Sequence, residues 1–214
     1  MMQTASKYAN AAIGHNEKVL QDIHLKSKNI AVYQRDIESL RQDLVHVAKR
    51  TLECRASGTA TEVLSVLQDF FKHDLPQCTA LLEDISETLR LFVRITQASS
   101  FRLMLTTVST NMCSRFHTDI NDLRLLCTYI GPGTLWLPDE AIDHKASRTR
   151  SNNQELVIDE QQIQQVSAGD IVILKGALFP EAKPILHQSP AIEQIGGKRL
   201  LLRIDTDEFL NFLT

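Results

Sequence analysis

The sequence predicts an α+β fold in which a mainly helical first half packs on a strand-rich second half. Apolar residues recur at helical spacing between residues 37 and 95, and short strand-like runs separated by turns follow from residue 101 onward. The change between the two patterns falls at Ser99-Ser100. A succession of short strands favours a β-sandwich or barrel over alternating strand and helix units.

The chain of 214 residues is long enough for one large domain or for a small domain with an appended one. Residues 1–28 are expected to be a mobile leader, because the sequence begins with small and polar residues that show no periodicity. Residues 29–98 are expected to be mainly helical after one opening strand, Asn29 to Arg35. Residues 99–214 hold the expected strands, and we expect them to form one compact domain with residues 29–98.

Three helices are expected in the first half, with Pro76 between the last two. The first follows Asp36, a possible N-cap. The apolar stripes of the three helices are Ile37, Leu40, Leu44 and Val47, then Val63, Leu64, Leu67, Phe70 and Phe71, and finally Leu81, Leu82, Ile85, Leu89, Phe92 and Val93.

The strands expected in the second half are separated by residues typical of turns. They cover residues 101–108, 122–130, 164–166, 170–174, 185–187 and 199–204. Gly131-Pro132-Gly133-Thr134 and Ala168-Gly169-Asp170 are expected to be tight turns. The polar stretch from His144 to Gln154 is the expected exposed loop.

Composition excludes several classes of protein. The net charge of -3 gives no electrostatic footprint for nucleic acid. No apolar run approaches the roughly 20 residues needed to span a membrane, and the first residues contain no apolar signal core, so a cytoplasmic location is expected. The four cysteines form no Cys-x-x-Cys pair, which predicts reduced and mostly buried thiols.

His117 and Asp119 are the best candidate for a chemical site. In an extended strand, side chains two residues apart share a face, so the imidazole and the carboxylate would point the same way. With His187 as the third ligand, they would form a 2-His-1-carboxylate facial triad, which leaves coordination positions open on Fe(II). Arg199 follows His187 and could hold a substrate carboxylate through a two-pronged hydrogen bond.

Each of these residues also has a structural interpretation. Asp119 could bond its own backbone in a surface turn, and His187 could be a histidine at a strand end that bonds the backbone. Cys113 could bind a softer metal such as zinc or be a small buried residue. His144 could replace His187 as a ligand.

Several short strings in this sequence resemble DUF1826, a family of uncharacterised bacterial proteins of unknown function. The strings are Arg115-Phe116-His117-Thr118-Asp119, residues 125–134, Lys175-Gly176, His187-Gln188-Ser189-Pro190 and Arg199-Leu200-Leu201-Leu202. The resemblance runs from about Asn29 to Asp205. It implies no assigned reaction, although it suggests a link to zinc homeostasis.

A looser resemblance is to the Fe(II)- and 2-oxoglutarate-dependent oxygenases, which show His-x-Asp, a distal His and a following Arg. It implies a double-stranded β-helix of the cupin or jelly-roll type in residues 99–214, with Fe(II) held by His117, Asp119 and His187. It also implies that Arg199 binds 2-oxoglutarate, which would be decarboxylated as a C–H bond is oxidised. Leu201 stands where the pattern often has a hydroxyl residue, and Arg203 is a second candidate for the carboxylate.

The sequence therefore supports three functional hypotheses. The first is an Fe(II)/2-oxoglutarate-dependent dioxygenase, and the second is a non-catalytic cupin-like protein that binds a metal, with zinc as the alternative ion. Two imidazoles and a carboxylate suit both ions. The third is a binding module without a metal. Neither the substrate nor the oligomeric state can be inferred from the sequence.

Overall fold

The largest element of the computed structural model, which describes residues 7–143, 153–180 and 183–206, is a seven-stranded sheet. Its order is β1-β2-β8-β5-β10-β4-β3, and every pairing is antiparallel except that of β1 with β2. The strands are β1 (Ala11–Gly14), β2 (Ile30–Tyr33), β3 (Glu53–Gly58), β4 (Phe101–Val108), β5 (Leu123–Ile130), β8 (Ile171–Lys175) and β10 (Arg199–Thr206).

A second, smaller sheet contains β6 (Leu135–Trp136), β7 (Gln164–Gln165) and β9 (His187–Gln188), in the order β7-β6-β9. An isolated antiparallel bridge between His117 and His187 adds one more segment beside β9. The chain alternates between the sheets from β4 onward. It passes from β4 to the His117 bridge, returns to β5, crosses to β6 and β7, returns to β8, crosses to β9 and ends in β10.

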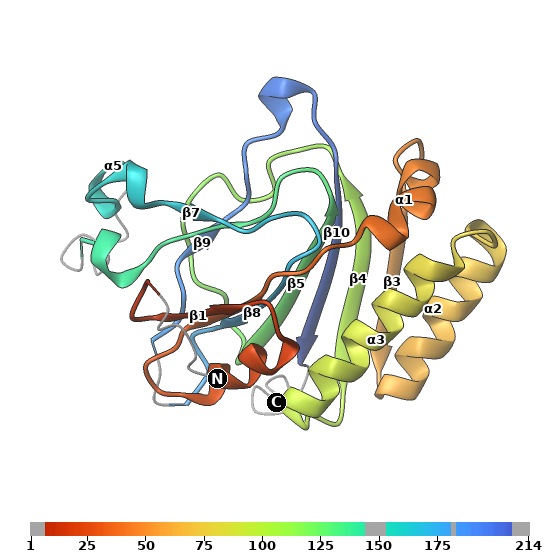
Figure 1. Ribbon diagram of the computed structural model, residues 1–214, viewed down its shortest axis with the longest axis horizontal. Coiled ribbons are helices and arrows are strands. Elements are labelled where there is room, and N and C mark those ends of the chain that lie inside the picture. The colour runs from red at the N-terminus through yellow and green to blue at the C-terminus, as the bar shows by residue number, and fades with distance from the viewer. Residues whose placement is uncertain (1–6, 144–152, 181–182, 207–214) are drawn as a thin grey trace.

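Two long helices, α2 (Ala60–Asp74) and α3 (Thr79–Thr96), lie side by side against one face of the large sheet (Figure 1). Their apolar faces join the main hydrophobic core with inward-facing residues of β3, β4, β5, β8 and β10. The remaining helical segments are short. They are η1 (Glu17–His24), η2 (Glu38–Leu40), α1 (Arg41–Val47), η3 (Asp139–Ala141), α5 (Asn153–Leu156), η4 (Glu160–Gln162) and η5 (Glu193–Ile195).

The alternation of side chains along β10 separates the core from the site. Leu200, Leu202 and Ile204 belong to the core beneath the helices, whereas Leu201 belongs to the second core, which includes Trp136 of the small sheet. Because side chains two residues apart in a strand share a face, Arg199, Arg203 and Asp205 point to the same side as Leu201. Polar groups from the central strands therefore face the small sheet.

The expected leader is wrong for most of its length, because residues 11–24 form β1 and η1. Ala11 and Ala12 are buried in a strand that pairs in parallel with β2. Leu20 and Ile23 are fully buried in the main core. The small residues at the start of the chain thus allow a close-packed edge strand, which their lack of periodicity did not predict.

The first half is only partly helical. Helices α1, α2 and α3 occur where the three apolar stripes predicted them, and β2 coincides with the expected opening strand. However, β1, β2 and β3 also belong to the large sheet. The structure is therefore a mixed α/β fold with a large, mostly antiparallel sheet, and all six strands expected in the second half are present.

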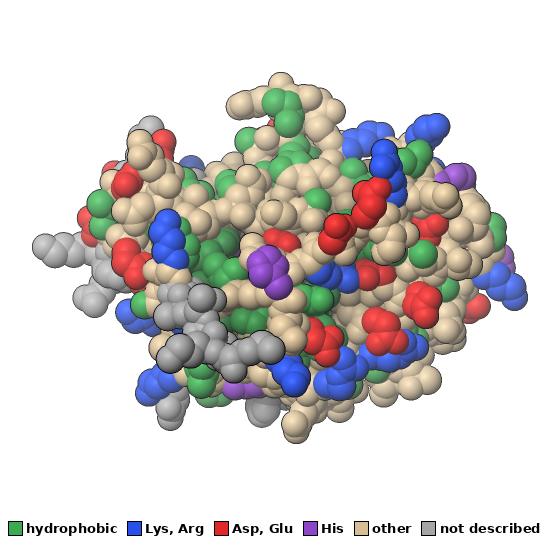
Figure 2. Space-filling view, in the orientation of Figure 1, with side chains coloured by type: hydrophobic (Ala, Val, Ile, Leu, Met, Phe, Trp, Pro, Cys, Tyr) green, Lys and Arg blue, Asp and Glu red, His purple; other side chains and the backbone are tan. Residues whose placement is uncertain are grey.

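Within the described ranges, no helix is both long enough and apolar enough to cross a bilayer. Figure 2 shows Lys and Arg side chains interspersed with Asp and Glu on the face that it draws. Charges of both signs are mixed there, so that face presents no broad field of one sign.

Helix α2 begins with a capping box that gives a first prediction. The Thr59 hydroxyl accepts from the Glu62 backbone N–H, and the Glu62 carboxylate accepts from the Thr59 backbone N–H. Thr59→Ala is expected to lower the free energy of unfolding by about 1 kcal/mol, because the Glu62 N–H loses its side-chain acceptor and the Glu62 carboxylate loses the Thr59 hydroxyl as a donor. Urea denaturation measures this loss, and Ser65→Ala on the exposed side of the same helix should leave the midpoint nearly unchanged.

The four cysteines differ in burial, as the sequence suggested. Cys54, Cys78 and Cys127 are buried free thiols, and Cys113 is partly exposed. Burial raises the pKa of Cys54 to about 11, and burial likewise raises the pKa of Cys127 to about 12. Because the thiolate is the nucleophile, iodoacetamide near neutral pH is expected to modify Cys113 alone in the folded protein. Peptide mapping by mass spectrometry tests this, and rapid labelling of Cys127 before unfolding would contradict it.

Candidate metal centre

His117 and Asp119 lie in the segment between β4 and β5, and backbone hydrogen bonds fix both ends of their tripeptide. The His117 N–H donates to the His187 carbonyl, and the His187 N–H donates to the His117 carbonyl, each over 3.0 Å. The Asp119 carbonyl accepts from the Ala177 N–H over 2.8 Å. Only the His117 bridge is strand-like, so the two side chains are brought together by anchored irregular backbone and not by a regular strand.

Gly176 allows the second anchor to form. A Cβ atom at this position would lie 2.0 Å from Asn121 Oδ1 and 2.2 Å from the Asn121 carbonyl oxygen. The Gly176 N–H donates to the Asp122 carbonyl over 2.8 Å, and the Leu178 N–H donates to that of Asn121 over 2.9 Å. A side chain at residue 176 would therefore push this segment, and Asp119 with it, away from the end of β8.

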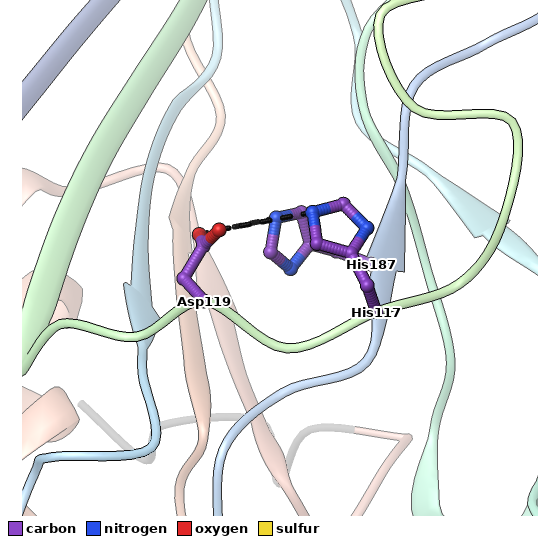
Figure 3. Close-up of side chains that lie close together, drawn as sticks. All are labelled: His117, Asp119 and His187. Carbon is purple, nitrogen blue, oxygen red and sulfur yellow. Dashed lines mark ion pairs between the residues drawn. The ribbon is translucent and has the colours of Figure 1, made fainter. Parts of the chain in front are cut away.

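The structure brings the three predicted ligands together (Figure 3). One ligand atom each from His117, Asp119 and His187 can be chosen such that all lie within 4.8 Å of one another. His187 Nε2 lies 3.2 Å from Asp119 Oδ2, and His117 Nε2 lies 3.7 Å from Asp119 Oδ1. The imidazole centroids are 4.5 Å apart and the rings are tilted by 45°. His187 and Asp119 are buried, and His117 is half-buried.

The backbone around the two rings favours the tautomer that a metal needs. His117 Nδ1 lies 3.0 Å from the Arg115 carbonyl, and His187 Nδ1 lies 3.4 Å from the Ile185 carbonyl. A carbonyl can only accept, so a proton on Nδ1 of each neutral ring would satisfy these contacts and leave the Nε2 lone pair for a metal. Two nitrogen lone pairs and a carboxylate then face one another. A cation between them would turn this repulsion into coordination.

The electrostatics of the cluster keep its ligands in the forms that bind metals. Burial lowers the pKa of His117, as does the neighbouring His187, which keeps the ring neutral. Burial raises the pKa of the Asp119 carboxyl, but His187 and Arg124 outweigh this effect and lower it to about 2. Asp119 Oδ2 is buried and has no partner with hydrogen-bond geometry. The site thus holds a buried, ionised carboxylate whose Oδ2 lies beside Arg124 and His187 without good hydrogen-bond geometry, and a carboxylate in this position can also bind a cation.

Arg124 and Asp205 form a network of ion pairs and hydrogen bonds that holds the Asp119 carboxylate. Arg124 Nη1 lies 2.5 Å from Asp119 Oδ2, and Arg124 Nε donates to Asp205 Oδ1, also over 2.5 Å. Asp205 also accepts from Asn121 Nδ2 over 3.1 Å, and its other oxygen lies 3.0 Å from Arg203 Nε. Sequence reasoning missed this network, since an arginine in a strand is usually solvated. The sequence feature that could have revealed it is the alternation of side chains along β5, which puts Arg124 on the face opposite Leu123 and Leu125.

Arg199 and Arg203, the two candidates for a carboxylate partner, differ in their surroundings. Arg199 is fully buried, and its Nη2 donates to Thr128 Oγ1 over 3.0 Å and to Thr134 Oγ1 over 3.4 Å. No carboxylate among the described residues pairs with it, whereas Arg203 lies against Asp205. Burial lowers the pKa of Arg199 to about 10, so its guanidinium stays charged at neutral pH. Thr128 and Thr134 thus place two hydroxyls beside Arg199, whereas Leu201, two residues further along β10, has none.

Cys113, one of two other candidate ligands, does not join the cluster. Among the described residues, the group of His, Cys, Asp and Glu side chains that could hold an ion does not include Cys113. His144 lies outside the described residues.

A cavity of about 1040 Å³ opens elsewhere, between β2, α1 and the end of β5. Its Arg35 is already paired with Asp84 through two hydrogen bonds, and none of the three ligands lines it.

Comparisons with known proteins give one family and a set of distant structures. The model of the family "Protein of unknown function (DUF1826)" matches residues 14–205. No curated protein matches the chain. Similar solved structures include a Pseudomonas putida prolyl-4-hydroxylase, with 10% identity, a TM-score of 0.47 and coverage of 89% of this chain and 97% of that one.

Two further solved structures are similarly distant. A full-length Neurospora crassa protein, solved in complex with alpha-KG, is 11% identical, with a TM-score of 0.44 and coverage of 89% of this chain and 78% of that one. The Fe(II)/(alpha)ketoglutarate-dependent dioxygenase TqaL is 13% identical, with a TM-score of 0.43 and coverage of 79% and 74%. At these values neither a fold nor a reaction passes to this chain, so its chemistry must follow from its own residues.

Proposed function

We propose that this chain, which belongs to the DUF1826 family of proteins of unknown function, is an Fe(II)- and 2-oxoglutarate-dependent oxygenase. The observation that carries the proposal is the convergence of His117, Asp119 and His187, whose ligand atoms lie within 4.8 Å of one another. Three protein ligands of this type hold Fe(II) and leave positions open for a cosubstrate and dioxygen. The ionised carboxylate of Asp119, which lies close to both imidazoles, supports a cation at this position.

The strand topology supports a double-stranded β-helix as the scaffold. From β4 to β10 the chain crosses between the two sheets in the order described above, and each sheet contributes four segments once the His117 bridge is counted. His117 and His187 lie in adjacent segments of the small sheet, and Arg199 begins the strand that follows. This order of the ligand pair, the distal ligand and the arginine along the strands supports the oxygenase proposal.

Arg199 is the residue that we assign to the far carboxylate of 2-oxoglutarate. A guanidinium that is buried without a carboxylate partner is costly, and an anionic ligand would offset that cost. The hydroxyls of Thr128 and Thr134 orient the guanidinium from one side. Arg203 is a weaker candidate because its Nε already lies 3.0 Å from Asp205.

Each residue then has a defined task. His117, Asp119 and His187 would hold the iron, and Arg124 would keep Asp119 aligned and ionised. The bound metal and cosubstrate would supply oxidation of a substrate C–H bond by dioxygen, with decarboxylation of 2-oxoglutarate. Trp136, Leu201 and Leu126 in the neighbouring core would keep bulk water away from that side of the site.

Anaerobic titration tests the proposal directly. The protein is loaded with Fe(II) without oxygen, and 2-oxoglutarate is added while the visible spectrum is recorded. The expected result is one equivalent of Fe(II) and a metal-to-ligand charge-transfer band that saturates with 2-oxoglutarate. Tight binding of one zinc ion, together with the absence of a band from the Fe(II)-loaded protein, would favour the non-catalytic metal protein. Failure to bind either ion would overturn the proposal.

A further inference from the structure

Both carboxylate oxygens of Asp119 face the two imidazoles of the metal centre. His187 Nε2 lies 3.2 Å from Oδ2, and His117 Nε2 lies 3.7 Å from Oδ1. Figure 3 shows the carboxylate directed at the two rings. Ligand atoms that bind a transition metal at about 2.1 Å in neighbouring octahedral positions are about 3.0 Å apart, which is close to these separations. The three ligands alone would therefore allow Asp119 to bind a metal through one oxygen or through both.

The choice between one oxygen and two sets the number of open coordination positions. An octahedral ion that receives one atom from each of three side chains keeps three positions open, whereas a carboxylate that binds through both oxygens leaves only two. The proposed reaction needs three positions, because 2-oxoglutarate takes two as a chelating ligand and one must remain for dioxygen. Asp119 must therefore be limited to one oxygen.

Arg124 occupies the second oxygen of this carboxylate. Its Nη1 lies 2.5 Å from Asp119 Oδ2, and the two side chains are only 16% and 12% exposed, so the solvent screens this ion pair little. A divalent cation and a guanidinium repel each other, so they are expected to take different oxygens of one carboxylate. With Arg124 on Oδ2, the metal is left with Oδ1.

The position of Arg124 is fixed by the large sheet and does not depend on a metal. Arg124 belongs to β5, the central strand of the sheet, and its Cα pairs in register with Asp205 of β10. Its Nε donates to Asp205 Oδ1 over 2.5 Å, and the Asp205 side chain is only 4% exposed. Asp205 also accepts from Asn121 Nδ2 over 3.1 Å and lies 3.0 Å from Arg203 Nε. The guanidinium is thus held beside Asp119 before a metal binds.

We propose that Arg124 is a positioning residue that restricts Asp119 to binding the metal through Oδ1 alone. The inference rests on the proposed metal site, and it adds the reason why three coordination positions stay open there. Glutamine at residue 124 separates this role from support of the sheet. Its amide nitrogen stands at the place of the arginine Nε, whereas it has no atom in place of Nη1. Arg124→Gln therefore keeps a donor to Asp205 and releases Asp119 Oδ2.

Simultaneous binding of two probes counts the open positions. Acetohydroxamate is a two-pronged metal chelator without a far carboxylate, so its binding does not need Arg199. Nitric oxide takes one position on Fe(II) and gives a characteristic EPR signal. In the Fe(II)-loaded parent protein without oxygen, acetohydroxamate is expected to change the shape of the nitrosyl signal and to leave its intensity unchanged. Loss of that signal when the chelator is added to the parent would overturn the inference.

In Arg124→Gln the two probes should compete for the metal. With acetohydroxamate at about ten times its dissociation constant, mass action then raises the nitric oxide concentration that gives half of the signal by about tenfold. Arg90→Gln, which removes an arginine ion-paired with Glu87 on the exposed side of α3, should behave as the parent does. In Arg124→Gln/Asp119→Asn, joint binding should return, because an amide has only one oxygen. Joint binding of both probes to a folded Arg124→Gln would contradict the assigned role.

These outcomes are separate from those that test the oxygenase. Joint binding in the parent without a charge-transfer band from 2-oxoglutarate would keep the role of Arg124 and remove the cosubstrate. A charge-transfer band together with competition between the probes in the parent would keep the cosubstrate and remove the role of Arg124. The measurement on the parent needs no variant, so it can overturn the inference even if Arg124→Gln does not fold.

Discussion

Replacing His187 by alanine is expected to weaken Fe(II) binding by more than about 100-fold, because loss of supporting groups around a metal ligand alone typically costs 10- to 100-fold. His187 lies 3.2 Å from Asp119 and pairs through its backbone with His117. The substitution removes one of three ligands but keeps both backbone hydrogen bonds. Anaerobic calorimetry with Fe(II) measures the loss, and the charge-transfer band with 2-oxoglutarate should disappear.

A matched control separates ligation from a general effect of removing an imidazole. His73 lies on the exposed side of α2, where its Nδ1 is 2.7 Å from the Asp69 carbonyl. His73→Ala should bind Fe(II) as the parent protein does. If His187→Ala kept parental affinity while the circular dichroism spectrum was unchanged, these residues would not be the metal ligands.

The His-x-Asp pair and the distal His could be identified from the sequence, because the two-residue spacing of the pair and the order of the three ligands can be read directly along the chain. That they meet in space depends on the His117–His187 bridge and on the close packing of Gly176 against Asn121, neither of which has a sequence signature. His117 and Asp119 therefore lie in a loop that is held by backbone hydrogen bonds, where the sequence suggested a regular strand. The sequence identified the types of ligand, but tertiary contacts determine how the ligands are arranged in space.

The network of Arg124 and Asp205 around Asp119 could not be predicted from the sequence, for a different reason. Arg124 and Asp205 look like ordinary polar residues of half-exposed strands, and they meet only because β5 and β10 pair in one register. A shift of one residue in this pairing would put the two side chains on opposite faces of the sheet. The strands β1 and β3 escaped notice because alanine, glycine and polar residues give them little β-propensity. Pairing with β2 and β4 determines their structure.

The variant Arg199→Met is expected to lower 2-oxoglutarate affinity strongly while leaving Fe(II) affinity within about twofold of the parent. Loss of one partner from a buried charge pair costs about 2–5 kcal/mol, which corresponds to roughly 30- to 5000-fold in Kd. Methionine is of similar length and fills the apolar part of the site. The measurement is the concentration of 2-oxoglutarate that gives half of the charge-transfer band, with Arg94→Gln on the exposed side of α3 as the control.

Thermal stability distinguishes a binding role for Arg199 from a structural one. Its guanidinium is buried against two threonine hydroxyls, and no carboxylate of the described residues neutralises it. A buried charge without a partner destabilises the folded state, so Arg199→Met should unfold at the same or a higher temperature than the parent in the absence of 2-oxoglutarate. Saturating 2-oxoglutarate should then raise the unfolding temperature of the parent but not that of the variant, because a ligand stabilises only the state that binds it. An arginine kept for packing alone would give the reverse pattern, with a large loss of stability in the unliganded variant and unchanged stabilisation by 2-oxoglutarate.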